Sequence, residues 1–235
     1  MKSKKVLKRC AAFLAAIILA LSAVVLNNII DSASAQTYSG TCGDNLTWTL
    51  DTGTGTLTIS GEGLMKDFSG EAPWYDYNSS IKTVELPDKL TRIGVSAFAE
   101  CINLTSITIP EGVTSIGDSA FAECSSLTTI TIPNGVTSIG NYAFEGCGSL
   151  TSITIPDSVT CIGSKTFTCC ESLEYINVDI NNSKYLSLDG VLFSKDEKIL
   201  IAYPNKKGSF YTVPAGVTSI DYCAFAECSS LTTIT

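Results

Sequence analysis

The chain repeats itself every 23 residues. Three consecutive segments align without a gap and read LTSITIPEGVTSIGDSAFAECSS (104–126), LTTITIPNGVTSIGNYAFEGCGS (127–149) and LTSITIPDSVTCIGSKTFTCCES (150–172). The leucine that begins each segment recurs at Leu173, in the same register. A fixed period of this size is typical of solenoids, in which similar coils stack on one another.

Within one unit, apolar residues recur where inward-facing side chains are expected. Ser106-Ile107-Thr108-Ile109 alternates with period two, as a strand with one buried face does. Pro110 ends that strand because it has no N–H to donate. The residues expected to point inward are Leu104, Ile107, Ile109, Val113, Ile116, Ala120, Phe121 and Cys124. One coil cannot bury these side chains by itself, so the units are expected to stack as an array with capped ends.

Gly117 follows the second inward stretch and has counterparts at Gly94, Gly140 and Gly163. We expect these glycines to adopt a positive φ, which costs glycine little. We also expect Ser119 to Phe121 to form at most one helical turn, with Phe121 as the largest side chain of its layer.

The pattern LxxIxIPxxVxxIGxxAFxxC resembles the BspA-like class of leucine-rich repeat, and the likeness runs from about Ile81 to the end of the chain. Proteins of that class occur on the surface of, or are secreted by, host-associated bacteria and some protozoa. The resemblance implies a β-rich (α/β-type) solenoid with short helical or irregular convex segments. It also implies a secreted, cell-surface or cell-wall location and a non-catalytic role in adhesion and protein binding.

Residues 1–35 have the features of a signal peptide. A basic start (Lys2, Lys4, Lys5, Lys8, Arg9) precedes an apolar run over residues 11–26, and Ala33-Ser34-Ala35 forms an A-x-A cleavage site. The alternative is an uncleaved anchor, but polar residues interrupt the run before the ~20 residues that a membrane span needs. We predict a mature chain that begins near Gln36 and has no membrane contact after cleavage.

Residues 36–80 are predicted to form a β-rich cap. Leu46–Leu50 and Leu57–Ile59 alternate on either side of a turn at residues 51–55, which indicates a β-hairpin. The aromatic stretch Ala72–Tyr77 then has two interpretations, a lid over the first layer of the solenoid or a platform for carbohydrate. We favour the lid, and SGTCGDNLTWTL and APWYDY resemble the leader of BspA-like repeats.

Residues 81–235 are predicted to form the repeat array. Leu231 lies two periods plus 12 residues beyond Leu173, so we expect irregular, hairpin-containing repeats over about 173–210, with Asp189-Gly190 as a tight turn. The chain stops five residues into a new repeat without a polar cap. Either it is a fragment of a longer protein, which we expect, or the last layer is left open.

Ten cysteines and no histidine constrain the chemistry. Cys101, Cys124, Cys147 and Cys170 are each 23 residues apart, and Cys228 continues the series. Disulfides would be the usual expectation in an exported protein, but a residue repeated once per layer is better explained as a buried small hydrophobe. We therefore expect free buried thiols. The lack of histidine also argues against a zinc site, and no metal or cofactor is predicted.

Catalysis is not expected. Without histidine there is no Ser-His-Asp or Cys-His arrangement, and the carboxylates Glu100, Glu123 and Glu227 form one regular outward row. Loss of the signal peptide removes five cations and one anion, which changes the formal net charge from −8 to −12. So acidic a protein is a poor ligand for nucleic acid or anionic membranes.

The outward side chains of the repeated strand form the candidate binding face. Its residues are Thr83, Ser106, Thr108, Thr129, Thr131, Ser152, Thr154, Tyr175 and Asn177. Threonine is common on exposed strands whatever the function, yet a rigid extended face suits a large partner. The first hypothesis is binding of a protein on a host or neighbouring cell. The second is glycan binding through Trp74, Tyr75, Tyr175 and the hydroxyl rows, as the targeting module of a longer surface enzyme. The third hypothesis is ice binding by the regularly spaced threonines, such as Thr129 and Thr131.

Overall fold

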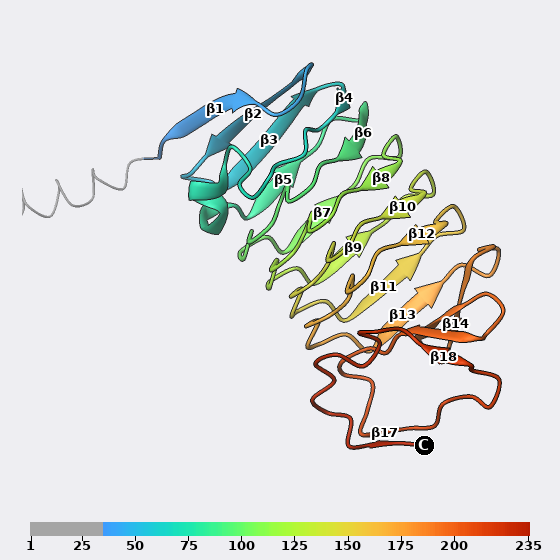
Figure 1. The fold of residues 1–235 in the computed structure, drawn as a ribbon. Helices are drawn as coiled ribbons and strands as arrows, with labels where there is room; N and C mark the ends of the chain where they lie inside the picture. The colour runs from blue at the N-terminus through green and yellow to red at the C-terminus, as the bar shows by residue number, and fades with distance from the viewer. Residues whose placement is uncertain (1–34) are drawn as a thin grey trace, which may run out of the picture. The chain divides into compact units, whose positions relative to one another are not determined.

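The repeats stack as a β-solenoid in a computed structural model that describes residues 35–235 (Figure 1). The predicted signal peptide lies outside the described residues, apart from Ala35. Each regular repeat contributes one strand to each of two parallel sheets and closes its coil with an irregular turn. The 23-residue period of the sequence is therefore the length of one coil.

The first sheet is built from the strand near the start of each repeat, which a proline follows in the regular repeats. Its strands are β5 (Thr83–Glu85), β7 (Ser106–Thr108), β9 (Thr129–Thr131), β11 (Ser152–Ile155) and β13 (Tyr175–Val178). They run parallel and side by side (Figure 1), with ladder hydrogen bonds that join β7 to β9 and β11 to β13. Ser106 pairs with Thr129 and Ser152 with Tyr175, so equivalent residues of successive repeats stand next to each other.

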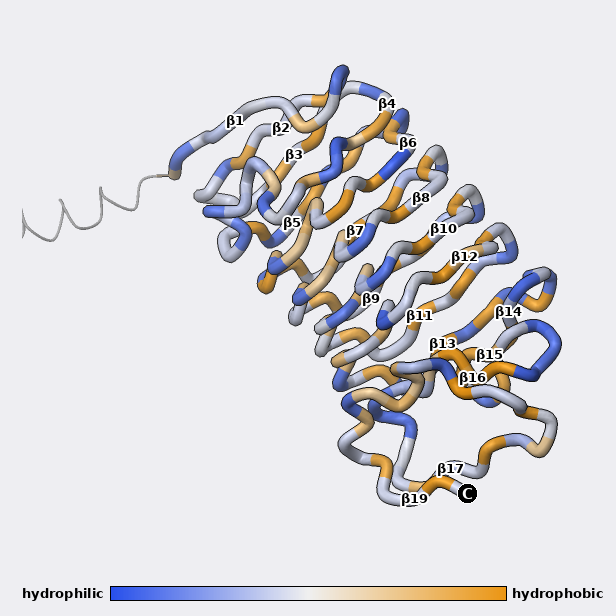
Figure 2. Tube along the Cα trace, viewed as in Figure 1, coloured by the Kyte–Doolittle hydropathy of each residue, from blue (hydrophilic) through white to orange (hydrophobic). Residues whose placement is uncertain are grey.

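The second sheet is built from the shorter strand that follows the proline. Its order is β12-β10-β8-β6-β4, and its strands are β4 (Gly63–Leu64), β6 (Leu90–Ile93), β8 (Ser115–Ile116), β10 (Ser138–Ile139) and β12 (Cys161–Ile162). The inward residues of β8 and β10 are Ile116 and Ile139, both buried. Figure 2 shows apolar and polar segments recurring in the same places along successive coils.

A column of aromatic rings fills the core of the array. Phe121 stacks on Phe144 with ring centroids 5.6 Å apart and an angle of 4° between the planes. Phe98 and Phe167 extend the column on either side, at 5.5 Å and 6.1 Å. The prediction that phenylalanine is the largest buried side chain of each layer is confirmed, and so is the burial of all eight apolar positions of the unit.

The expectation of positive φ at the four repeated glycines is wrong. The positive φ angles occur two residues later, at Ser96, Ser119, Tyr142 and Lys165. The glycines are needed because the coils approach closely: a methyl group on Gly117 would lie 2.6 Å from the backbone nitrogen of Val95 in the preceding coil. The expectation of at most one helical turn is confirmed, since Ser119 to Phe121 belong to a turn that does not extend into a helix.

The N-terminal cap continues both sheets. Its strands β1 (Thr37–Thr41), β2 (Leu46–Asp51) and β3 (Thr56–Gly61) are antiparallel, which confirms the predicted hairpin, and β3 then pairs in parallel with β5. A 3₁₀ helix, η1 (Tyr75–Ser80), follows Trp74. Trp74 is 1% exposed and continues the aromatic column, so this stretch covers the first coil as the lid interpretation predicted.

An antiparallel hairpin interrupts the repeats where the insertion was predicted. It consists of β14 (Tyr185–Leu188) and β15 (Val191–Ser194), and a third antiparallel strand, β16 (Ile199–Ala202), pairs with β15. Asp189 and Gly190 form its two-residue turn, and both have positive φ, as a hairpin turn of this kind requires. Regular coils resume with β17 (Phe210–Tyr211), β18 (Ser219–Ile220) and β19 (Thr233–Ile234).

Two side chains finish the second sheet where the hairpin displaces the next strand. The Tyr185 hydroxyl accepts the N–H of Ile162 at 3.0 Å, in place of a backbone carbonyl. The buried Asn182 amide donates to the carbonyls of Pro156 and Val159, and its oxygen accepts from two backbone N–H groups. The Tyr185 bond satisfies a backbone N–H that the missing strand would otherwise have paired, and the Asn182 bonds join the turn before β12 to the next coil.

Candidate binding face

The nine predicted face residues all lie on the exposed side of the first sheet. Along β7 and β9 two exposed residues flank one buried isoleucine, as the alternation predicted. The two outward rows are Thr83, Ser106, Thr129, Ser152 and Tyr175, and Glu85, Thr108, Thr131, Thr154 and Asn177. We call this surface the hydroxyl face. The structure brings its residues together in two straight rows.

The hydroxyl groups of this face retain their hydrogen-bonding capacity. Within the described residues, the side chains of Thr108, Thr129 and Thr131 make no hydrogen bond to the chain. Threonines elsewhere in the coil behave differently: Thr114 and Thr128 each donate to a backbone carbonyl exactly one repeat earlier, at 3.1 Å. The hydroxyl face can therefore donate to and accept from a polar partner without breaking bonds of its own.

The far end of the hydroxyl face carries an aromatic and a charged group. Tyr175 is 46% exposed, and the ammonium of Lys207 lies 5.3 Å from the centre of its ring. Lys207 also pairs with Asp189 at 2.9 Å, so the hairpin fixes both groups against the tyrosine. Sequence reasoning missed Lys207 and Asp189, because the long insertion breaks the period that located Tyr175.

The aromatic residues of the glycan hypothesis do not form one site. Trp74 is buried against Phe98, with 6.0 Å between the ring centroids, and its indole N–H donates to the Ala97 carbonyl. Tyr75 lies in η1 with its hydroxyl 3.3 Å from the Glu100 carboxylate, whereas Tyr175 lies on β13. Neither face of the Trp74 ring is free to stack on a sugar, so that part of the hypothesis is wrong.

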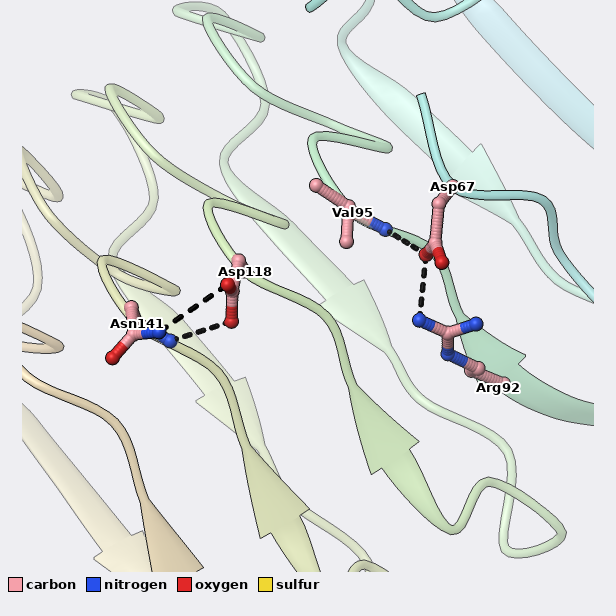
Figure 3. Close-up of polar contacts among 5 residues, drawn as sticks. All are labelled: Asp67, Arg92, Val95, Asp118 and Asn141. Atoms are coloured by element: carbon pink, nitrogen blue, oxygen red, sulfur yellow. Dashed lines mark hydrogen bonds and ion pairs between the residues drawn. The ribbon is translucent and has the colours of Figure 1, made fainter. Parts of the chain in front are cut away.

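A second polar surface lies along the outer side of the second sheet, and sequence reasoning did not identify it. Arg92 on β6 contacts Asp67 at 2.6 Å, and the same carboxylate accepts the backbone N–H of Val95 (Figure 3). Burial opposes ionisation of Asp67, but these hydrogen bonds and the guanidinium charge outweigh it and lower the pKa of the carboxyl. Asp67 therefore stays ionised at neutral pH.

Two repeats further along, Asp118 binds the following coil in the same manner. Its two oxygens accept the backbone N–H of Asn141 at 2.8 Å and the amide of the same residue at 3.2 Å (Figure 3). Asn141 in turn accepts the N–H of Ser164. The signal available in the sequence was the polar residue that follows three of the four repeated glycines, at Asp118, Asn141 and Ser164.

The cysteine series lies in the core beside the phenylalanine column. The thiols of Cys124, Cys147 and Cys170 each donate to the carbonyl of a phenylalanine in the preceding coil, at 3.1–3.3 Å. Burial raises the pKa of Cys124 and of Cys170 to about 12. A buried thiol of this kind is a poor nucleophile, because the thiolate is the reactive form.

Two further features bear on function. Within residues 35–235, no three Asp, Glu or Cys side chains come together as ligands for a metal ion. In the same part of the chain, no helix has the length and apolar character needed to cross a membrane.

The repeats match the sequence model of the BspA type leucine rich repeat region. Six copies are found, over residues 74–198 and 202–235. The chain belongs to the BspA-type leucine-rich repeat family. The match begins at Trp74, the residue with which the aromatic column starts.

Solved structures of leucine-rich repeat proteins share the fold of this BspA-type protein. A leucine-rich repeat protein from Eubacterium ventriosum is 31% identical, with a TM-score of 0.68 over 85% of this chain and 62% of the other. The pneumococcal vaccine antigen PcpA is 21% identical, with a TM-score of 0.61 over 84% of this chain and 64% of the other, which shows the fold alone.

A leucine rich cell surface protein from Faecalibacterium prausnitzii is 25% identical, with a TM-score of 0.50 over 86% of this chain and 73% of the other. The chain thus spans less than two thirds of the length of the first two of these proteins. No curated protein matches the sequence.

Proposed function

We propose that this BspA-type protein is a secreted or cell-surface adhesion module, and that its hydroxyl face binds a protein on a host or neighbouring cell. The hydroxyl face carries the proposal, since it is a parallel sheet whose outward side chains are exposed and free to bond. A specific protein interface covers about 800 Å² on each partner. A rigid, extended sheet can supply such an area through many weak contacts.

The ends of the hydroxyl face provide the more specific groups. Tyr175 offers a half-exposed ring held in place by Lys207, and tyrosine is enriched among the residues that dominate binding energy at interfaces. Glu85 at the other end accepts a hydrogen bond from Thr58 at 2.9 Å. We expect the partner to contact Tyr175 and the rows beside it.

Binding without catalysis is favoured by the composition of the chain. It contains no histidine, so the usual general base of hydrolytic triads is missing. The cell-surface location is supported by the signal peptide predicted for residues 1–35 and by the F. prausnitzii relative, which is described as a cell surface protein.

The experiment uses residues 36–235, fluorescently labelled, with cultured epithelial cells and with neighbouring bacteria. We expect saturable binding that is lost after the cells are treated with trypsin and retained after their glycans are oxidised with periodate. The double substitution Thr131→Arg and Thr154→Arg places two long cations on the hydroxyl face and should reduce binding at least tenfold.

Asn134→Arg is the matched control, because Asn134 is exposed in the turn between the two sheets of the same repeat as Thr131. All variants are checked for an unchanged melting temperature. Binding that survives the double substitution, or that depends on glycans and not on proteins, would overturn the proposal.

A further inference from the structure

The outer side of the second sheet is hollowed into a trough. One wall is the outward row of the strands, Leu64, Arg92, Ser115, Ser138 and Cys161, which stand next to one another in register. The other wall includes Asp118 and Asn141 from the turns that follow. A hollow of about 520 Å³ around Leu64 and one of about 400 Å³ around Ser138 meet at Arg92.

The floor of the trough is backbone. Gly117, Gly140 and Gly163 line it between the two walls, and none of them can carry a side chain, because a methyl group would strike the preceding coil. Their N–H groups are already used: Gly117 donates to the Ile93 carbonyl at 3.0 Å and Gly140 to the Ile116 carbonyl at 2.9 Å. The floor therefore offers no free backbone edge with which a peptide strand could pair.

The walls offer free polar side chains instead. Within the described residues, the hydroxyls of Ser115 and Ser138 make no hydrogen bond to the chain. Arg92 uses one of its guanidinium nitrogens, for Asp67, and its remaining N–H donors are unused. The neighbouring threonines Thr114 and Thr137 are different, since both hydroxyls are bonded to the backbone.

All the charged groups in and beside the trough except Asp118 are already paired with each other. Asp67 binds Arg92, Glu62 lies 3.1 Å from Lys89, and Asp44 lies 3.7 Å from Lys66. Asp118 is held by the amide of Asn141. A strongly charged ligand would have to separate these pairs, whereas a neutral ligand with many donors and acceptors would not.

We propose that the trough binds a linear neutral polysaccharide that lies along the axis of the solenoid. Its hydroxyls would bond to Ser115, Ser138 and Asp118, with the free N–H groups of Arg92 at one end. Neighbouring strands are about 4.8 Å apart, which is close to the length of one sugar unit in an extended chain. Successive sugars thus lie over successive coils, in which the equivalent positions carry Arg92, Ser115 and Ser138. This site is separate from the hydroxyl face and does not depend on it.

The test is titration calorimetry of residues 36–235 with neutral hexasaccharides: β-1,4-linked glucose, β-1,4-linked mannose and α-1,4-linked glucose. We expect at least one to bind. Ser138→Arg fills the trough and should weaken that binding at least tenfold. Asn134→Arg is the matched control, because it places the same side chain in an exposed turn of the same repeat and should leave the affinity unchanged. Thr131→Arg, on the other sheet of that repeat, tests whether the sugar binds the hydroxyl face instead.

Melting temperatures show whether all three variants remain folded, and a neutral decapeptide serves as a competing ligand. The proposal is overturned if no hexasaccharide binds at millimolar concentration, or if the decapeptide displaces the sugar completely at equal concentration. It is equally overturned if Thr131→Arg abolishes binding and Ser138→Arg does not, which would place the sugar on the hydroxyl face. None of these outcomes bears on adhesion to proteins, which the cell-binding assay tests separately.

Discussion

The indole of Trp74 stacks on the ring of Phe98, with 6.0 Å between the centroids and 20° between the planes. Trp74 belongs to the cap and Phe98 to the first repeat, so the cap continues the aromatic column of the array with a larger side chain. A solenoid needs its first layer covered. Here the indole of Trp74 covers Phe98, as the phenylalanine of a further repeat would.

The aromatic column predicts a large difference between the inside and the outside of one coil. Phe121→Ala should lower the free energy of unfolding by about 3–5 kcal/mol, since it leaves a cavity between two stacked rings. Thr131→Ala, on the hydroxyl face, should change it by less than about 0.5 kcal/mol. Urea denaturation of both variants measures the difference, and equal effects would contradict the assignment of the two positions.

The repeated glycines should be intolerant of any side chain. Gly140→Ala brings a methyl group within 3.0 Å of the backbone of the preceding coil and should cost about 1–3 kcal/mol. Gly216→Ala is the control, because open space surrounds Gly216 and the substitution should be neutral or slightly stabilising. Gly140→Asn separates the two explanations: a requirement for positive φ would tolerate asparagine, and a steric requirement would not.

The end of the second sheet should depend on one amide. Asn182→Ala removes bonds to two carbonyls and two N–H groups in a buried place and should destabilise the protein by about 2–4 kcal/mol. Asn181→Ala, at the exposed neighbouring position, should cost less than about 0.5 kcal/mol. Thermal unfolding of the two variants under the same conditions provides the comparison.

The buried thiols should make stability fall in alkali. The folded-state pKa of Cys124 and Cys170 is about 12, above the value near 8.5 of an unfolded chain. The stabilisation by these thiols is complete below pH 8.5 and is lost as the pH rises toward 12. Urea unfolding at pH 7, 9, 10 and 11 should show this decline. The double variant Cys124→Ala and Cys170→Ala should lose less over the same range, and an identical decline would refute the role of the thiols.

The same cysteines should be reduced and protected in the folded protein. Their thiols donate to carbonyls of the preceding coil, so a disulfide would remove those bonds and shift the packing of a layer. Mass spectrometry of non-reduced protein should find Cys101, Cys124, Cys147 and Cys170 unlinked, with alkylation by bulky reagents only after unfolding. Peptides joined through Cys124 and Cys147 at high occupancy would show that disulfides cross-link successive coils, and would contradict this prediction.

The period of the sequence was sufficient to predict the coil, the inward residues and the hydroxyl face. Alternation around Ile107 and Ile130 placed Thr108 and Thr131 outside, and the structure agrees. Side-chain bonds between coils could not be predicted in this way, because a repeat pattern tells which residues are equivalent and not what they contact. The trough was missed for that reason: Arg92 occupies the place of Ser115 in a more divergent repeat, and its partner Asp67 lies in the cap.

The function of the repeated glycine was misassigned because two different constraints favour the same residue. Both positive φ and close approach of backbones select glycine, and only the distance between coils distinguishes them. The Tyr185 contact was missed for another reason, since it replaces a backbone group of a strand that a regular array would have supplied. Asn182 was missed because it lies in the irregular stretch that the repeat pattern does not describe.

The threonine bonds between coils have a consequence for how such proteins change length. Thr114, Thr137 and Thr160 each reach back to a carbonyl 23 residues earlier and to nothing farther along the chain. Unequal recombination that gains or loses one of these regular repeats would thus keep the threonine bond between each coil and the coil before it. Such a gene can lengthen or shorten its product in single steps, and the length of the solenoid becomes a heritable variable.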